Sequence, residues 1–93
     1  MADTFGLSGK PMLVVGGGSG IGQATVELLV EVGARVAVAD VDPARAKQVA
    51  SDVGGHAIAG DVTIPEGAQQ VVDDAHAAVG GLYGVANIVG QVG

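Results

Sequence analysis

A glycine-rich segment near the start of the chain constrains the fold more than any other feature. Residues 16–22 read Gly-Gly-Gly-Ser-Gly-Ile-Gly, after the apolar run 12–15 and before apolar residues at helical spacing. A strand, a turn with few side chains and a helix start expose unpaired backbone N–H groups, where the helix dipole adds partial positive charge. Because glycine has no Cβ, a pyrophosphate can approach this backbone closely. The segment therefore predicts a phosphate-binding turn.

Two kinds of apolar spacing alternate along the chain. Short apolar runs typical of parallel strands occupy 12–15, 35–39, 56–59 and 83–89. Three amphipathic segments lie between these runs, and glycines at 33, 54–55 and 80–81 end them. We predict an α/β chain with a Rossmann-type three-layer fold, in which a partial parallel sheet of four strands in the order 3-2-1-4 is combined with three helices. Residues 1–93 are expected to form a single domain.

The apolar positions also predict which face of each helix is buried. The expected stripes are Ile21, Ala24, Thr25, Leu28 and Val32 in the first helix, Ala46, Val49, Ala50 and Val53 in the second, and Ala68, Val71, Val72, Ala75 and Val79 in the third.

Two helix starts are indicated by polar residues. Asp42 can cap the second helix, with Pro43 at its first position. Thr63 and Glu66 flank Pro65 at the spacing of a capping box, which we expect at the start of the third helix.

Composition excludes several classes of function. The net charge is −6, and a nucleic-acid partner needs a basic face, so none is expected. The chain has no cysteine, and its two histidines stand apart from clustered acids, so we predict no metal site. No apolar run approaches the about 18 residues of a membrane span, and no export signal is evident at the N-terminus. We therefore expect no membrane partner and a cytoplasmic location.

Candidate ligand-binding residues converge on one edge of the predicted sheet. Ligands of such sheets bind outside the carboxyl ends of the strands, at the point where the strand order reverses. Gly16, Asp40, Asp61 and Gly90 all follow predicted strands and fall at this edge. Their convergence predicts a binding site there.

The glycine spacing resembles that of one family. It reads G-x-x-x-G-x-G from Gly16 to Gly20 and Gly22, and no register fits G-x-G-x-x-G. This spacing is similar to the N-terminal motif of the short-chain dehydrogenase/reductase family. Asp40 at the end of the second strand, Asp61 followed by Val62, and the segment 87–90 match further positions of that family. The resemblance implies an oxidoreductase that acts on alcohol or carbonyl groups with a nicotinamide cofactor. A methyltransferase that binds S-adenosylmethionine is a less favoured interpretation, because the glycine spacing in this chain is not the one expected for that class.

The resemblance implies a role for each matched position. Ser19, Gly20 and Ile21 would line the pyrophosphate after the turn at Gly16, and Gly22 would let the helix pack closely on the strand. Asp40 would bind the adenosine ribose hydroxyls and repel a 2′-phosphate, which favours NAD over NADP.

Three other matched positions lie farther along the chain. Asp61 and Val62 would contact adenine, and Asn87 with Gly90 would contact the ribose or brace the central strands. Reasoning from the residues alone leaves two alternatives, since Asp61 can cap the following helix and Asp40 can be a solvated strand end.

The chain also departs from the family pattern. Val15, Ile88 and Val89 replace the usual threonine, asparagine and alanine, so NAD binding is expected to be weaker than usual. The family's catalytic Ser, Tyr and Lys lie beyond the fourth strand, and Tyr83 has no Lys four residues later. We therefore predict no catalytic residue in this chain, a domain truncated after the fourth strand, and no activity of the chain by itself.

Two other interpretations of the chain compete with the interpretation that it is part of an enzyme. One is a stand-alone, non-catalytic module that binds NAD or pairs with other subunits, and the other is a degenerate remnant that binds nothing. Truncation would also leave the fourth strand as an open edge, and such edges pair with other chains. We therefore expect self-association or pairing through that edge.

Overall fold

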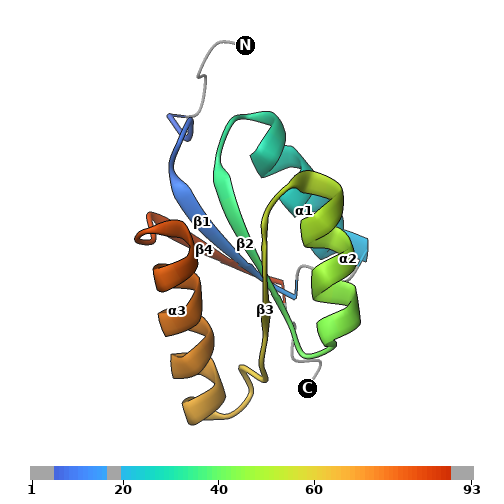
Figure 1. Cartoon of the computed structure of the whole chain (residues 1–93), viewed down its shortest axis with the longest axis vertical. Coiled ribbons are helices and arrows are strands. Elements are labelled where there is room, and N and C mark those ends of the chain that lie inside the picture. Colours follow the sequence, from blue (N-terminus) through green and yellow to red (C-terminus); the bar gives the residue numbers. More distant parts are fainter. Residues whose placement is uncertain (1–5, 17–19, 89–93) are drawn as a thin grey trace.

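The computed structural model describes residues 6–16 and 20–88 as a parallel sheet with helices on both faces (Figure 1). Each strand is followed by a helix up to the last strand. In chain order the elements are β1 (Pro11–Val15), α1 (Gly20–Glu31), β2 (Arg35–Asp40), α2 (Pro43–Val53), β3 (His56–Ala59), α3 (Pro65–Val79) and β4 (Gly84–Asn87).

The strand order is β3-β2-β1-β4, and every pair is parallel. The β1 residue Val15 is level with Ala39 of β2 on one side and with Asn87 of β4 on the other. Asp40 of β2 is level with Ala59 of β3. The predicted topology is therefore confirmed, and the carboxyl ends of all four strands meet at one edge.

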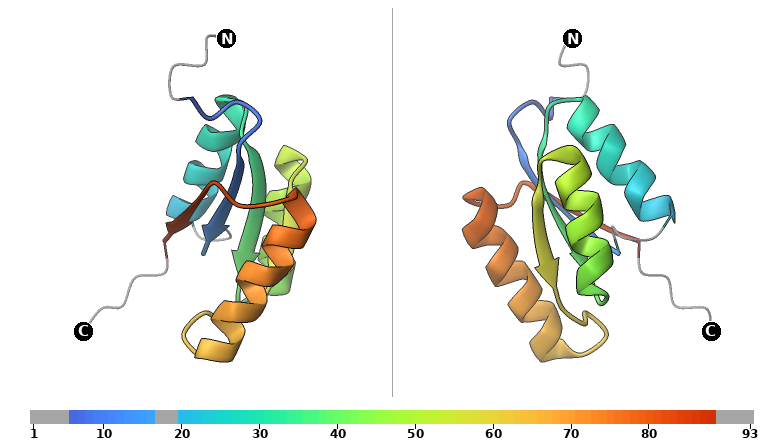
Figure 2. Two further views of the ribbon diagram at one scale, coloured as in Figure 1. Left: turned by 90° about the vertical axis from the view of Figure 1, so that its left-hand side faces the viewer. Right: turned by 45° about the vertical axis from the view of Figure 1, so that its right-hand side comes forward.

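Successive residues of the central strands β1 and β2 serve opposite layers. The helices α1 and α2 cover one face of the sheet, and α3 covers the other (Figure 2). Leu13 and Ala37 pack with Val71 of α3 in one core, whereas Val14 and Val38 pack in the other. This alternation is what a central parallel strand requires, because both of its faces are covered.

Most of the predicted helix ends are confirmed. The Asp42 side chain caps α2, since it accepts hydrogen bonds from the backbone N–H groups of Ala44 at 3.0 Å and Arg45 at 3.4 Å. Gly54 and Gly80 end α2 and α3 in the left-handed conformation, with φ of +72° and +76°. Glycine adopts this conformation without the steric cost that a Cβ brings.

The predicted capping box at the start of α3 is wrong. The N-cap residue is Ile64, and no side chain caps the helix there. The Thr63 hydroxyl donates instead to Oδ1 of Asp61. Competition from a carboxylate two residues earlier thus removes the hydroxyl from the helix end.

The predicted buried face of α1 is also wrong. Gly22 and Val26 are the buried residues of the helix, while Ile21 is 73% exposed and Leu28 is 57% exposed. The helix carries apolar residues at helical spacing on two sides, and periodicity does not choose between them. The side that faces the sheet is the one that carries Gly22 and Val26. For α2 and α3 the predicted stripes hold at most positions, and Val72 is an exposed exception.

The strand β4 is shorter than predicted and has one neighbour among the described strands. Pairing with β1 continues on either side of β4, because Tyr83 N donates to Pro11 O at 2.7 Å and Ile88 N donates to Val15 O at 2.8 Å. Val85 is 53% exposed at this edge of the sheet. In the part of the chain that the structure describes, no helix combines the length and the apolar character needed to cross a membrane.

Candidate functional site

A pocket lies where the carboxyl ends of β1, β2 and β3 meet. It has a volume of about 290 Å³ and is formed by the strand ends and the turns that follow them. Its lining residues are Val15, Gly16, Asp40, Val41, Gly60, Asp61, Val62 and Thr63. Four of the predicted site residues, Gly16, Asp40, Asp61 and Val62, are therefore brought together in one cavity.

Gly16 ends β1 at the wall of this pocket. Its backbone N–H donates to Ala39 O at 2.7 Å, which extends the pairing with β2 by one step. Its φ is +82°, in the region that favours glycine, and the chain leaves the sheet there. A residue with a Cβ would be strained at this position. The turn geometry thus requires the first glycine of the motif.

Asp40 stands at the carboxyl end of β2 with a defined orientation. Its Oδ1 accepts a hydrogen bond from the backbone N–H of Asp42 at 2.9 Å. Asp42 in turn caps α2 and lies 3.7 Å from Nε of Arg45. A chain of local contacts therefore connects the start of α2 to the carboxylate in the pocket.

Asp61 is held by the turn between β3 and α3. Its Oδ1 accepts from the Thr63 backbone N–H at 2.9 Å and from the Thr63 hydroxyl at 2.5 Å. These two bonds, the hydroxyl bond first, hold the pKa of the Asp61 carboxyl below its ordinary value of 3.8. The alternative in which Asp61 caps α3 is not supported, because its bonds stay within the turn and the N-cap is Ile64.

Two glycines that sequence reasoning missed place Asp61 against α3. A Cβ at Gly67 would overlap the carbonyl oxygen of Asp61, and a Cβ at Gly60 would overlap a methyl group of Val71. The first turn of α3 can therefore approach the pocket wall only because both positions lack a side chain. For Gly67, its place inside an otherwise regular helical pattern was the available signal.

The start of α1 flanks the same edge of the sheet. A Cβ added at Gly20 would meet no atom of the described residues within 4 Å, so protein packing does not require glycine there. Gly22 is buried and Ile21 is exposed, and the packing role of Gly22 stays a prediction. Asn87 ends β4 beside Val15. Ser19 and Gly90 lie outside the described residues.

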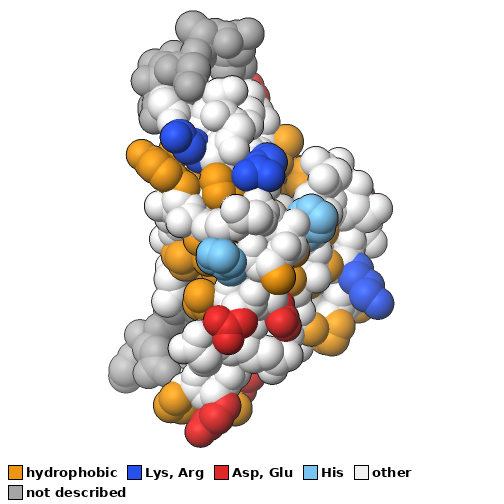
Figure 3. Space-filling model, turned by 60° about the vertical axis from the view of Figure 1, so that its left-hand side comes forward, with side chains coloured by type: hydrophobic (Ala, Val, Ile, Leu, Met, Phe, Trp, Pro, Cys, Tyr) orange, Lys and Arg blue, Asp and Glu red, His pale blue; other side chains and the backbone are white. Residues whose placement is uncertain are grey.

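The electrostatics of this edge come from the backbone and from acidic side chains. Asp and Glu side chains gather toward the carboxyl end of the strands on the face shown in Figure 3. The eight residues that line the pocket include two aspartates and no lysine or arginine. Among the described residues, backbone N–H groups and the α1 dipole can therefore attract an anionic group here, while the carboxylates suit hydroxyl or amine donors.

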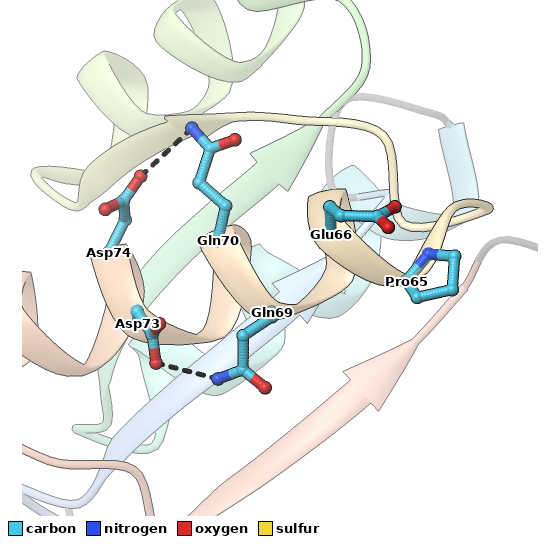
Figure 4. A pocket seen from close by; sticks show the side chains of 6 residues that line it. All are labelled: Pro65, Glu66, Gln69, Gln70, Asp73 and Asp74. Carbon is cyan, nitrogen blue, oxygen red and sulfur yellow. Dashed lines mark hydrogen bonds between the residues drawn. The ribbon is translucent and has the colours of Figure 1, made fainter.

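A second depression lies on the outer surface of α3. Figure 4 shows its lining residues, which are Pro65, Glu66, Gln69, Gln70, Asp73 and Asp74. Gln69 donates to Asp73 at 2.9 Å and Gln70 donates to Asp74 at 3.5 Å. Pairs four residues apart on an exposed helix stabilise that helix, and they give this surface no feature of a cofactor site.

Comparison with known proteins agrees with the fold. Residues 10–93 match the family described as short chain dehydrogenase. The chain is 48% identical over 83 residues to 2,5-dichloro-2,5-cyclohexadiene-1,4-diol dehydrogenase of Sphingobium indicum, which covers 87% of this chain and 33% of that protein. It is 40% identical over 86 residues to (-)-isopiperitenol/(-)-carveol dehydrogenase, mitochondrial, of Mentha piperita, which covers 88% of this chain and 32% of that protein.

A solved structure is similar as well. The 3-ketoacyl-(acyl-carrier-protein) reductase from Brucella melitensis, complexed with NADH, superposes with a TM-score of 0.81 at 31% identity, over 85% of this chain and 34% of that one.

The chain belongs to the short chain dehydrogenase family. It spans about a third of the length of the relatives that it matches. The part in common contains the glycine turn and the pocket described above, and the resemblance predicted from the motif spacing is confirmed.

Proposed function

We propose that this chain is the NAD(H)-binding N-terminal portion of an oxidoreductase that acts on alcohol or carbonyl groups. The single observation that carries the proposal is the pocket at the ends of β1, β2 and β3, with Gly16, Asp40 and Asp61 in its wall. A nicotinamide dinucleotide is supported by family membership and by the similar reductase that was solved with NADH. When bound, the cofactor would accept or donate a hydride.

The choice of NAD over NADP rests on Asp40. Its carboxylate lines the pocket at the end of β2, where it can accept hydrogen bonds from ribose hydroxyls. A 2′-phosphate at that place would meet like charge. Val41, the next lining residue, carries no charge that could compensate. The carboxyl end of β2 thus favours a ribose without a 2′-phosphate.

The remaining predicted contacts follow from the same placement. Asp61 and Val62 line the pocket beside Asp40 and would hold adenine. The start of α1 at Gly20, Ile21 and Gly22 would hold the pyrophosphate, together with Ser19, and Asn87 with Gly90 would serve the ribose or brace the strands. A cytoplasmic location and a lack of activity of the isolated chain remain predictions.

Calorimetric titration of the chain with NAD and with NADP tests this proposal. We expect saturable binding of NAD and weaker binding of NADP. Asp40→Ala should weaken NAD binding by about 1–3 kcal/mol, the cost of leaving hydrogen-bonding groups unpaired, and should reduce the preference over NADP. Asp52→Ala, on the exposed side of α2, is the control and should change neither affinity. No saturable heat with either cofactor would overturn the proposal.

The exposed edge at β4 favours a second role beside cofactor binding. Val85 is 53% exposed there, and among the described strands β4 pairs only with β1. We propose that this edge pairs with another chain, a second copy of this one included. Such pairing would fit either a portion of an enzyme or a stand-alone binding module.

A further inference from the structure

Thr63 lines the same pocket as Asp61 but has no role in the proposal above. It donates two hydrogen bonds to a single oxygen, Oδ1 of Asp61, from its backbone N–H at 2.9 Å and from its hydroxyl at 2.5 Å. Hydrogen bonds from a hydroxyl to a carboxylate at this distance are among the strong ones. The Oδ1 atom of Asp61 is therefore occupied by hydrogen bonds within the turn.

The other oxygen of Asp61 is left for a ligand. Among the described residues, Oδ2 of Asp61 accepts no hydrogen bond, although the residue lines the pocket. The pinned Oδ1 restricts rotation of the carboxylate, so the direction in which Oδ2 can accept is set before a ligand arrives. Groups held by such supporting contacts bind without the entropy cost of being ordered.

We propose that Thr63 is a positioning residue, whose hydroxyl orients Asp61 to accept a hydrogen bond from the amino group of adenine. This inference rests on the proposed function, because it assumes that the adenine end of a dinucleotide occupies the pocket. It adds to the proposed site a residue outside the glycine turn and the aspartates.

A comparison of two ligands isolates the contact. The affinity of the chain is measured for NAD and for the NAD analogue in which a hydrogen replaces the adenine amino group. We expect NAD to bind the wild-type chain more tightly than the analogue. Thr63→Val keeps the branched shape and removes the hydroxyl, and it should weaken NAD binding roughly three- to tenfold, the range for one hydrogen bond. Binding of the analogue should be unchanged.

Conservative rescue and a matched substitution complete the test. Thr63→Ser retains a hydroxyl and should restore the wild-type ratio of the two affinities. Thr25→Val removes a hydroxyl that donates to Ile21 O at 2.9 Å within α1, and it should leave that ratio unchanged. Circular dichroism checks that the valine variant folds. If it does not fold, Thr63→Ala is a second variant that lacks the hydroxyl.

The possible failures are distinguishable. If the hydroxyl-free variants weaken both ligands equally, or neither, Thr63 only supports the turn and the inference is overturned while NAD binding stands. If the wild-type chain binds neither ligand, the proposed function itself fails, and the inference fails with it.

Discussion

The aspartates at the ends of β2 and β3 are held by the same kind of local hydrogen bond. Oδ1 of Asp40 accepts from the N–H of Asp42, and Oδ1 of Asp61 accepts from the N–H of Thr63, each at 2.9 Å. Both aspartates could be predicted as site residues, because the carboxyl ends of parallel strands are known once the strands are. The hydrogen bonds could not be predicted, since a threonine two residues after an aspartate fits a helix cap as well as a turn.

The titration of Asp61 should depend on the Thr63 hydroxyl. A carboxyl whose pKa is lowered in the folded state stabilises that state above its unfolded pKa, and this contribution is lost as the pH falls through the folded pKa. The Thr63 hydroxyl is the main cause of the lowered pKa. We therefore expect Thr63→Val to raise the pKa of Asp61 toward 3.8, measured by NMR of the side-chain carboxyl carbon. An equal pKa in both proteins would contradict this account.

The close approach of α3 to the pocket should make Gly67 intolerant of a side chain. Gly67→Ala places a Cβ on the carbonyl oxygen of Asp61, and we expect a loss of about 1–3 kcal/mol in the free energy of unfolding, as for other overpacked sites. Urea unfolding measures the change. Gly20→Ala, whose Cβ meets no atom of the described residues within 4 Å, is the matched control and should lose much less. Equal losses would show that alanine is accommodated at position 67.

At the scale of whole elements, the strand order could be predicted and the orientation of one helix could not. Short connections and right-handed crossovers leave few ways to arrange β1 to β4, so the order 3-2-1-4 followed from the sequence. Both α2 and α3 present a single apolar stripe to the sheet. In contrast, α1 has two, and the contact is made through Gly22 and Val26. The hydrophobicity pattern of α1 does not report which of the two sides is buried, and a buried glycine adds nothing to such a pattern.

The exposed edge at β4 should make the isolated chain self-associate. Unpaired strand edges associate at concentrations of about tens of micromolar. Val85→Lys places a charge on the edge and is expected to shift the chain toward monomer in analytical ultracentrifugation. Val72→Lys, on the exposed side of α3, is the control and should not. A wild-type chain that is monomeric at these concentrations would remove the proposed pairing.

Over the whole molecule, cofactor binding should appear as added thermal stability. A ligand that binds only the folded chain, present at about 100 times its Kd, stabilises it by about 2.7 kcal/mol. For a domain of this size that corresponds to a rise in Tm of roughly 10–20 °C. Scanning calorimetry with NAD, and with NADP at the same concentration, should show the larger shift for NAD. An unchanged Tm with NAD at saturating concentration would contradict binding to the folded state.

The alternation of β2 side chains between the two cores bears on how this chain can diverge. Inserting or deleting one residue within β2 would send Ala37 and Val38 into each other's layer, and both layers would lose their fit. Tolerated changes in length are therefore confined to the turns, such as those around Val41 and Val62, which line the pocket. Related proteins can thus acquire new ligand preferences by lengthening or shortening a turn, while the interior stays as it is.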